Sequence, residues 1–280
     1  MIMNKIMDGK LVRDIRLKEL KNKIANLDCK LTLAVVSVGN DEASKIYIKQ
    51  KEKLASKIGY NFLNVHFDSI NENDLINKIK ELNIDNSVTG IIVQLPLPNY
   101  LNKHNILNSI SPIKDVDGLT NDNFIKLIRN EEGLVPCTPK GIVSLLDYYK
   151  IDLKKNIVIV GRSELVGLPL FHLLLNRNAT VTICHSKTDK LDNYTKNADI
   201  LIVAVGKKYL IKKDMIKDNA VIVSVGINRE NDKIYGDVDD SCFDKVLFMT
   251  PTPGGVGPMT VISLMENVYE AYQLSLEKKK

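Results

Sequence analysis

The sequence predicts a two-domain α/β protein with mainly parallel sheets. Short apolar, β-rich runs alternate with amphipathic helical stretches, which is the pattern of β-α-β units. The alternation occurs in two series, one in each half of the chain. The length of 280 residues is large for one hydrophobic core and suits two domains.

The first series predicts an N-terminal three-layer domain, in which helices cover a parallel sheet. The apolar runs and the helical spacing between them predict three strands and two helices: strands at Leu31–Val38, Tyr60–Phe67 and Gly90–Leu95, and helices at Asp41–Ile58 and Glu72–Leu82.

The second series predicts a Rossmann-type sheet. Its strands are expected at Ile157–Val160, Thr180–Cys184, Ile200–Val205, Ala220–Val225 and Val246–Met249. The first of these runs is apolar at every position, which is typical of a central strand buried on both faces. A helix at Thr138–Tyr149 is expected between the two series, with Thr138 as N-cap and Pro139 in the first turn. A last helix is expected at about Pro258–Leu276.

Composition excludes several classes of function. The net charge of +5 comes from interspersed charges, and no basic stripe with aromatic residues indicates a nucleic-acid surface. No run approaches the roughly 18 apolar residues of a membrane span, and the N-terminus has no apolar stretch typical of a signal peptide. The four cysteines and four histidines lack metal-site spacing, so we expect no metal and a reducing, cytoplasmic location.

A glycine turn follows the strand at Ile157–Val160. Gly161 and Gly167 hold the first and last positions of the G-x-G-x-x-G pattern, and Ser163 replaces the middle glycine. Such a turn lets the backbone approach a pyrophosphate at a helix N-terminus. Taken alone, the same residues also fit a plain tight turn between a strand and a helix.

The end of the next strand favours NADP over NAD. An NAD site usually places an acid there to hold the ribose 2′-hydroxyl. Here the strand runs into His185-Ser186-Lys187 and carries no acid. Arg162, Ser186 and Lys187 would attract a 2′-phosphate, whereas we interpret His185 as a packed or surface residue.

Two features of the first half could carry chemistry. Tyr47 and Lys51 are four residues apart on a helix and therefore project from one face, although such a pair is usually the wet side of a helix. Gln94 interrupts an apolar strand, near the sheet edge where open α/β proteins bind ligands. A buried glutamine there is either an internal hydrogen-bond link or a ligand contact.

Two loops add further candidates. Asp115 and Asp117 lie in a turn before Gly118, where acids more often serve the turn than a site. The segment Pro251 to Pro258 is rich in glycine and proline and runs into a helix N-terminus. Such a loop exposes backbone amides and suits a flat or anionic ligand.

These segments together resemble the methylenetetrahydrofolate dehydrogenase/cyclohydrolase family over essentially the whole chain. The matching blocks in the first half are Val38-Gly39 with Ala43-Ser44, Tyr47 and Lys51, then 90–98 and 114–118. Those in the second half are 136–141, Gly161-Arg162-Ser163 with Val166-Gly167 and Pro169, then 203–207, 225–228 and 253–260. One block would be a hint, but all of them in order are specific.

The resemblance implies two consecutive activities in one-carbon folate metabolism. The family oxidises methylenetetrahydrofolate to methenyltetrahydrofolate with NADP and hydrolyses that product to 10-formyltetrahydrofolate. It also implies a cleft between a folate-binding catalytic domain, here 1–118 plus about 258–280, and an NADP-binding domain, here 119–257. The implied assembly is a homodimer.

Carried over by position, the resemblance implies roles for individual residues. Lys51 would be the general acid/base, Gln94 would hold it by a hydrogen bond, and Tyr47 would pack on the folate ring and help to orient it. Asp117 would bind the amino edge of the pterin. Further substrate contacts are implied for Leu95, Pro253, Gly254 and Gly255. Cofactor contacts are implied for Gly161, Arg162, Ser163, Ser186 and Ile227.

Three positions depart from the family pattern: Ser224 replaces a common aspartate, Lys208 a usual proline, and Ile125 a frequent glycine. None of them is a proposed catalytic group. Three other functions compete with the implied one: an NAD-preferring single-activity dehydrogenase of the same fold, an amino-acid or malate-type oxidoreductase, and a binding protein without catalysis. Arg162 and Ser186 argue against the first, the set Lys51, Gln94 and Asp117 against the second, and Lys51 against the third.

Overall fold

The computed structural model describes residues 5–231 and 233–277 and divides the chain into two units. Unit 1 contains the N-terminal residues up to Ile15 together with Thr138–Thr260. Unit 2 contains Arg16–Cys137 together with the residues from Val261 onward. The division falls inside helices α1 (Gly9–Ile24) and α9 (Val256–Glu277). No helix among the described residues is long and apolar enough to cross a membrane.

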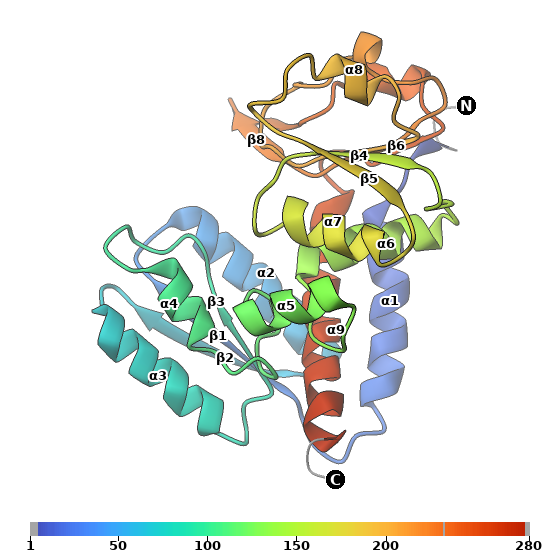
Figure 1. Cartoon of the computed structure of the whole chain (residues 1–280). Coiled ribbons are helices and arrows are strands. Elements are labelled where there is room, and N and C mark those ends of the chain that lie inside the picture. Colours follow the sequence, from blue (N-terminus) through green and yellow to red (C-terminus); the bar gives the residue numbers. More distant parts are fainter. Residues whose placement is uncertain (1–4, 232, 278–280) are drawn as a thin grey trace. The chain divides into compact units, whose positions relative to one another are not determined.

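Unit 2 is built on a parallel three-stranded sheet of order β2-β1-β3. Its elements are β1 (Thr32–Val38), α2 (Glu42–Ile58), β2 (Asn61–Phe67), α3 (Glu72–Ile84), β3 (Gly90–Val93), α4 (Lys103–Asn108) and α5 (Asn121–Arg129). The central strand β1 is buried along nearly its whole length, because residues on both of its faces pack against other elements. On one face, apolar residues of β1 and β3 form a core with those of α3 and α4, and Figure 1 shows these two helices beside the sheet.

Unit 1 is built on a parallel five-stranded sheet of order β10-β7-β6-β4-β5. Its elements are α6 (Cys137–Tyr148), β4 (Asn156–Val160), α7 (Gly167–Leu175), β5 (Thr180–Cys184), α8 (Asp192–Thr195), β6 (Ile200–Val203), β7 (Val221–Ser224) and β10 (Phe248–Met249), with 3-10 turns at Lys213–Met215 and Asp240–Asp244. An antiparallel hairpin, β8 (Ile227–Glu230) and β9 (Lys233–Gly236), follows β7. The chain continues from β4 to β5 on one side of β4 and to β6 on the other, so the carboxyl ends of β4 and β6 form a topological switch point.

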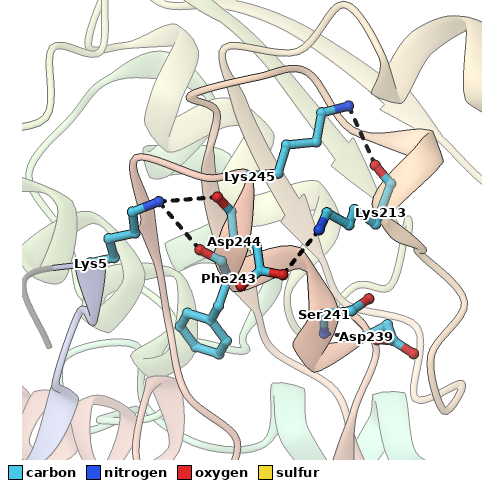
Figure 2. Close-up of polar contacts among 7 residues, drawn as sticks. All are labelled: Lys5, Lys213, Asp239, Ser241, Phe243, Asp244 and Lys245. Carbon is cyan, nitrogen blue, oxygen red and sulfur yellow. Dashed lines mark hydrogen bonds and ion pairs between the residues drawn. The ribbon is translucent and has the colours of Figure 1, made fainter. Parts of the chain in front are cut away.

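The N-terminal residues are tied to unit 1 by backbone and lysine contacts. Met7 N donates to Met249 O at 2.9 Å, beside a bridge between Ile6 and Met249. Figure 2 shows Lys5 Nζ donating to the carbonyls of Phe243 (3.5 Å) and Asp244 (3.2 Å). These contacts explain why the N-terminal residues belong to the same unit as β10.

The predicted α/β class is confirmed, and every predicted strand and helix exists within a few residues of its expected bounds. The expected central position of the strand at Ile157–Val160 is also confirmed, since β4 pairs with β5 and β6 and is buried. The N-cap role of Thr138 is wrong, because α6 already begins at Cys137 and the Thr138 hydroxyl bonds that of Thr260 at 3.0 Å. The sequence patterns did not predict α1, α4, α5 or the hairpin β8–β9.

Candidate active site

Helix α2 places a lysine in the position of a core residue. Asp41 caps the helix by accepting from Ser44 N at 2.7 Å, and Gly59, with φ +103°, ends it. Lys51 lies three residues after the buried Ile48 and four before the buried Ala55, so it shares their apolar stripe. Its side chain is half-buried. The position of Lys51 among apolar residues at helical spacing could have been recognised in the sequence. The spacing between Tyr47 and Lys51 alone did not indicate it.

Gln94 meets that lysine. It lies just beyond the end of β3, where its backbone N donates to Val36 O at 2.8 Å. Its side-chain Nε2 donates to Leu95 O at 2.6 Å, and its Oε1 accepts from Lys51 Nζ at 2.8 Å. The bond to Leu95 O orients the amide, so that its oxygen faces the lysine. The buried glutamine is therefore an internal hydrogen-bond link to Lys51.

The environment of Lys51 favours its neutral form more than water does. Burial lowers the pKa of the Lys51 ammonium from its ordinary value, while the negative charge of Asp117 opposes that shift. A lysine with a lowered pKa is neutral more often than a lysine in water, and the neutral amine is the form that can accept a proton. Tyr47, one helical turn before Lys51, exposes 43% of its surface.

The two acids of the 114–118 turn have separate tasks. Asp115 is buried and accepts from Thr120 N at 2.7 Å and Asn123 Nδ2 at 3.0 Å, which holds the following loop. Burial raises the pKa of Asp115, and these hydrogen bonds oppose that rise. Asp117 is only half-buried and interacts electrostatically with Lys51. The turn thus uses one acid for structure, whereas the other stays half-buried and interacts with Lys51.

Asn267, on α9, fixes the backbone on which Asp117 lies. Its Nδ2 donates at 2.8 Å both to Val116 O and to Val135 O. Cys137 Sγ donates to the same Val116 carbonyl at 3.3 Å. Sequence reasoning missed both residues, although a buried asparagine within the apolar face of the last helix was a visible signal.

The turn after β4 is closed by glycines. Gly161 has φ +125°, and a Cβ atom there would overlap Ala204 O. A Cβ atom on Gly167, where α7 begins, would overlap Gly161 O. Ser163 Oγ accepts from Val166 N at 3.2 Å and so supports the turn. This compact turn leads into a helix N-terminus at the switch point, as a bound pyrophosphate requires.

The end of β5 lies beside that turn, since Gly161 N donates to Cys184 O at 2.8 Å. The tight turn from His185 to Thr188 leaves Ser186 and Lys187 exposed. His185 Nδ1 accepts from Lys187 N at 3.2 Å, which gives this histidine a role in the turn. Arg162 is exposed on the neighbouring turn. The acid expected of an NAD site is absent from β5 and from this turn.

The remaining predicted residues of unit 1 lie on two further segments. Ile227 begins β8 and exposes 45% of its surface. Pro253 and Gly254 precede α9 in an exposed or half-buried loop, whereas Gly255 is buried and packs against Gly9. The glycine-rich loop is shorter than predicted, because α9 begins at Val256. No group of three or more potential metal ligands occurs in the described ranges 5–231 and 233–277.

A parallel sheet with a glycine turn at its switch point, in a chain with a second α/β unit, defines a two-domain enzyme of the NAD(P)-binding class. Comparison with protein families specifies it further. Residues 7–117 match the family model for the tetrahydrofolate dehydrogenase/cyclohydrolase catalytic domain, and residues 136–276 match that for its NAD(P)-binding domain. The chain belongs to the tetrahydrofolate dehydrogenase/cyclohydrolase family.

Individual relatives agree with this assignment. The chain is 48% identical over 277 residues to the bifunctional protein FolD of Aquifex aeolicus, a match covering 96% of this chain and 95% of that protein. The crystal structure of the bifunctional FolD enzyme of Campylobacter jejuni is 43% identical, with a TM-score of 0.94 over 96% of this chain and 99% of that one. A FolD structure from Trypanosoma brucei, complexed with NADP and an inhibitor, is 31% identical with a TM-score of 0.92 and covers 97% and 98% of the two chains.

Proposed function

We propose that the chain oxidises 5,10-methylenetetrahydrofolate to 5,10-methenyltetrahydrofolate with NADP and then hydrolyses the product to 10-formyltetrahydrofolate. Family membership over both units supports the pair of reactions. The observation that carries the hydrolytic half is the half-buried Lys51, which is held by Gln94 and has a lowered pKa.

The two steps make different demands on the protein. Hydride loss from the methylene carbon leaves a cation delocalised over two nitrogens, so this step needs alignment more than a base. In the hydrolysis, water adds to the cationic carbon, and the water proton has to be removed. Neutral Lys51 accepts that proton, and its ammonium returns it to the nitrogen that leaves as the carbon–nitrogen bond breaks, while the hydroxyl of the adduct loses its proton to solvent as the formyl C=O forms. One proton is released overall.

The neighbours of Lys51 orient the reactants. Gln94 holds the amine of Lys51 on one side of helix α2, because the Gln94 amide is itself fixed by its hydrogen bond to Leu95 O. We assign the amino edge of the pterin to Asp117, whose carboxylate is an acceptor for two N–H donors. The exposed ring of Tyr47 supplies a flat apolar surface for the folate. The 253–255 segment offers further substrate contacts through its backbone.

The residues of unit 1 fit NADP. The Gly161 turn leaves room for pyrophosphate at the N-terminus of α7, while Arg162 and Ser186 provide a cation and a hydroxyl for a 2′-phosphate. Ile227 presents an apolar side chain beside the same sheet edge. The chemistry that NADP supplies when bound is acceptance of a hydride.

We further propose a homodimer in the cytoplasm. The edge strand β2 contains exposed and half-buried residues and no buried one, which makes it a candidate surface for a second copy. The four cysteines are free thiols, which is compatible with a reducing compartment. Light scattering of the purified chain tests the dimer.

The deciding experiment follows the absorbance of the methenyl product in the wild type and in Lys51→Met. We expect the substitution to lower the cyclohydrolase rate by about 10² to 10⁴-fold, the range that general acid/base groups contribute. Some dehydrogenase activity should persist. Lys53→Met, an exposed lysine on the same helix, serves as the control. Retention of both activities in Lys51→Met contradicts the assigned role, and a wild type that forms no methenyl product contradicts the function.

A further inference from the structure

A second buried carboxylate, that of Asp237, lies in unit 1 and takes no part in the steps above. Asp237 directly follows β9, and its exposed fraction is 0%. Burying a carboxylate is costly unless its oxygens are hydrogen-bonded. The hydrogen-bond donors around the Asp237 carboxylate therefore show which parts of the structure this residue holds in place.

The Asp237 carboxylate bonds the backbone of two loops. Its Oδ2 accepts from Val205 N and from Gly226 N, both at 3.0 Å, and its Oδ1 accepts from Lys207 N at 2.7 Å. Val205 and Lys207 follow β6, while Gly226 follows β7. One side chain thus joins the loops at the carboxyl ends of two neighbouring parallel strands.

These loops border the cofactor turn. Ala204, next to Val205, packs so closely on Gly161 that no Cβ atom fits between them. Gly226 immediately precedes Ile227, and a Cβ atom on Gly226 would overlap the Asp237 carboxylate. The positions of the Gly161 turn and of Ile227 consequently depend on the distance that the carboxylate sets between the two loops.

Nearby groups hold the same arrangement. Ser224, the residue that departs from the family pattern, accepts from Asp237 N through its hydroxyl at 3.1 Å. The Asn228 amide, in the orientation that satisfies both partners, donates to Gly206 O at 2.6 Å and accepts from Lys208 N at 3.0 Å. Burial raises the pKa of Asp237, and its backbone hydrogen bonds oppose that rise.

We propose that Asp237 is a positioning residue of the NADP site, which holds the loops after β6 and β7 at the spacing that cofactor binding requires. This inference rests on the proposed function. A change at Asp237 should affect the dehydrogenase but not the hydrolysis, because hydrolysis of the methenyl compound consumes no NADP. The two activities of one protein can therefore report on the two sites independently.

The test is Asp237→Asn, which keeps the size of the side chain but turns one acceptor into an NH₂ donor facing backbone N–H groups. Loss of such buried hydrogen bonds should raise the KM for NADP about tenfold and weaken NADP binding, measured directly by calorimetry, to a similar extent. Cyclohydrolase activity on supplied methenyltetrahydrofolate should stay within about twofold of the wild type, because only the cofactor loops are disturbed.

The matched control is Asp239→Asn, two residues further on. Asp239 accepts from Ser241 N at 2.8 Å (Figure 2), a bond that asparagine can also accept, so the NADP KM should not change. An equal loss of both activities in Asp237→Asn would show a merely structural role and overturn the proposal. An unchanged NADP KM in the folded variant would overturn it as well.

Ser224→Ala provides a milder variant if Asp237→Asn does not fold. It removes the acceptor for Asp237 N and should raise the NADP KM about threefold, again without affecting hydrolysis. An unchanged NADP KM in folded Ser224→Ala then counts against the proposal. A wild type that does not reduce NADP contradicts the proposed function itself, whereas an active wild type with unaffected variants contradicts only the role of Asp237.

Discussion

The two candidate sites of this chain differ in whether backbone or side chains form them. The cofactor turn in unit 1 is shaped by backbone, through Gly161, Gly167 and the amides held by Asp237. The folate site in unit 2 is shaped by side chains, above all Lys51 and Gln94. A backbone site should be most sensitive to an added Cβ atom, whereas a side-chain site should be most sensitive to the loss of one functional group.

The largest effect expected in the backbone-built site is that of Gly161→Ala. The variant combines φ +125° with an overlap against Ala204 O, so NADP binding should weaken about a hundredfold while methenyl hydrolysis persists. Titration with NADP and the hydrolysis assay measure the two effects. Gly59→Ala, at φ +103° with nothing within 4 Å, carries similar strain in unit 2 and should leave NADP binding unchanged. Equal NADP affinity in the wild type and in Gly161→Ala would contradict the view that the cofactor site depends on the shape of its backbone.

A smaller effect is expected from a charge at the end of β5. Ser186→Asp places a carboxylate where a 2′-phosphate is expected, and like-charge repulsion should raise the KM for NADP about tenfold relative to that for NAD. Rates with the two cofactors measure the change. Ser186→Asn has the same shape without the charge and should change the ratio much less. If both variants behave alike, the preference for NADP comes from another residue.

The smallest effect concerns the pH dependence of hydrolysis. In the proposed mechanism neutral Lys51 is the base, so the rate of hydrolysis should rise with pH as its ammonium loses a proton. Because the charge of Asp117 raises the pKa of Lys51, Asp117→Asn should lower that pKa further and move the rising limb to lower pH. The pH profile of kcat measures this shift, and Asp122→Asn, on the exposed first turn of α5, is its control. A limb that moves to higher pH would contradict the charge interaction.

The fold was largely predictable because its strongest elements are regular. The continuous apolar run of β4 and the helical spacing of α3 specify burial directly. Helix α5 and the hairpin β8–β9 were missed because they are short: α5 spans nine residues, and each strand of the hairpin spans four. Strand ends were also overextended, since apolar residues such as Val205 continue past the last ladder bond.

The chemistry of the sites was less visible than the fold. Glycines and missing acids can be recognised along the chain, which is why the cofactor turn could be predicted from local sequence. The Lys51–Gln94 bond joins residues 43 positions apart, and only the resemblance to a family paired them. Asp115 and Asp117 differ in burial, and the sequence of the turn alone does not indicate which of the two acids is buried.

The location of Lys51 in the apolar stripe of α2 also lowers the stability of the folded protein, although the proposed hydrolysis depends on this residue. An amine whose pKa is lowered by burial is held at the expense of native-state stability at neutral pH, because the unfolded chain binds that proton more readily. An apolar residue of similar length should fit the stripe better, so Lys51→Met is expected to melt at a higher temperature than the wild type, by about 2–4 °C for each kcal/mol recovered. The proposed role in hydrolysis is therefore one that Lys51 would fill at a cost in stability.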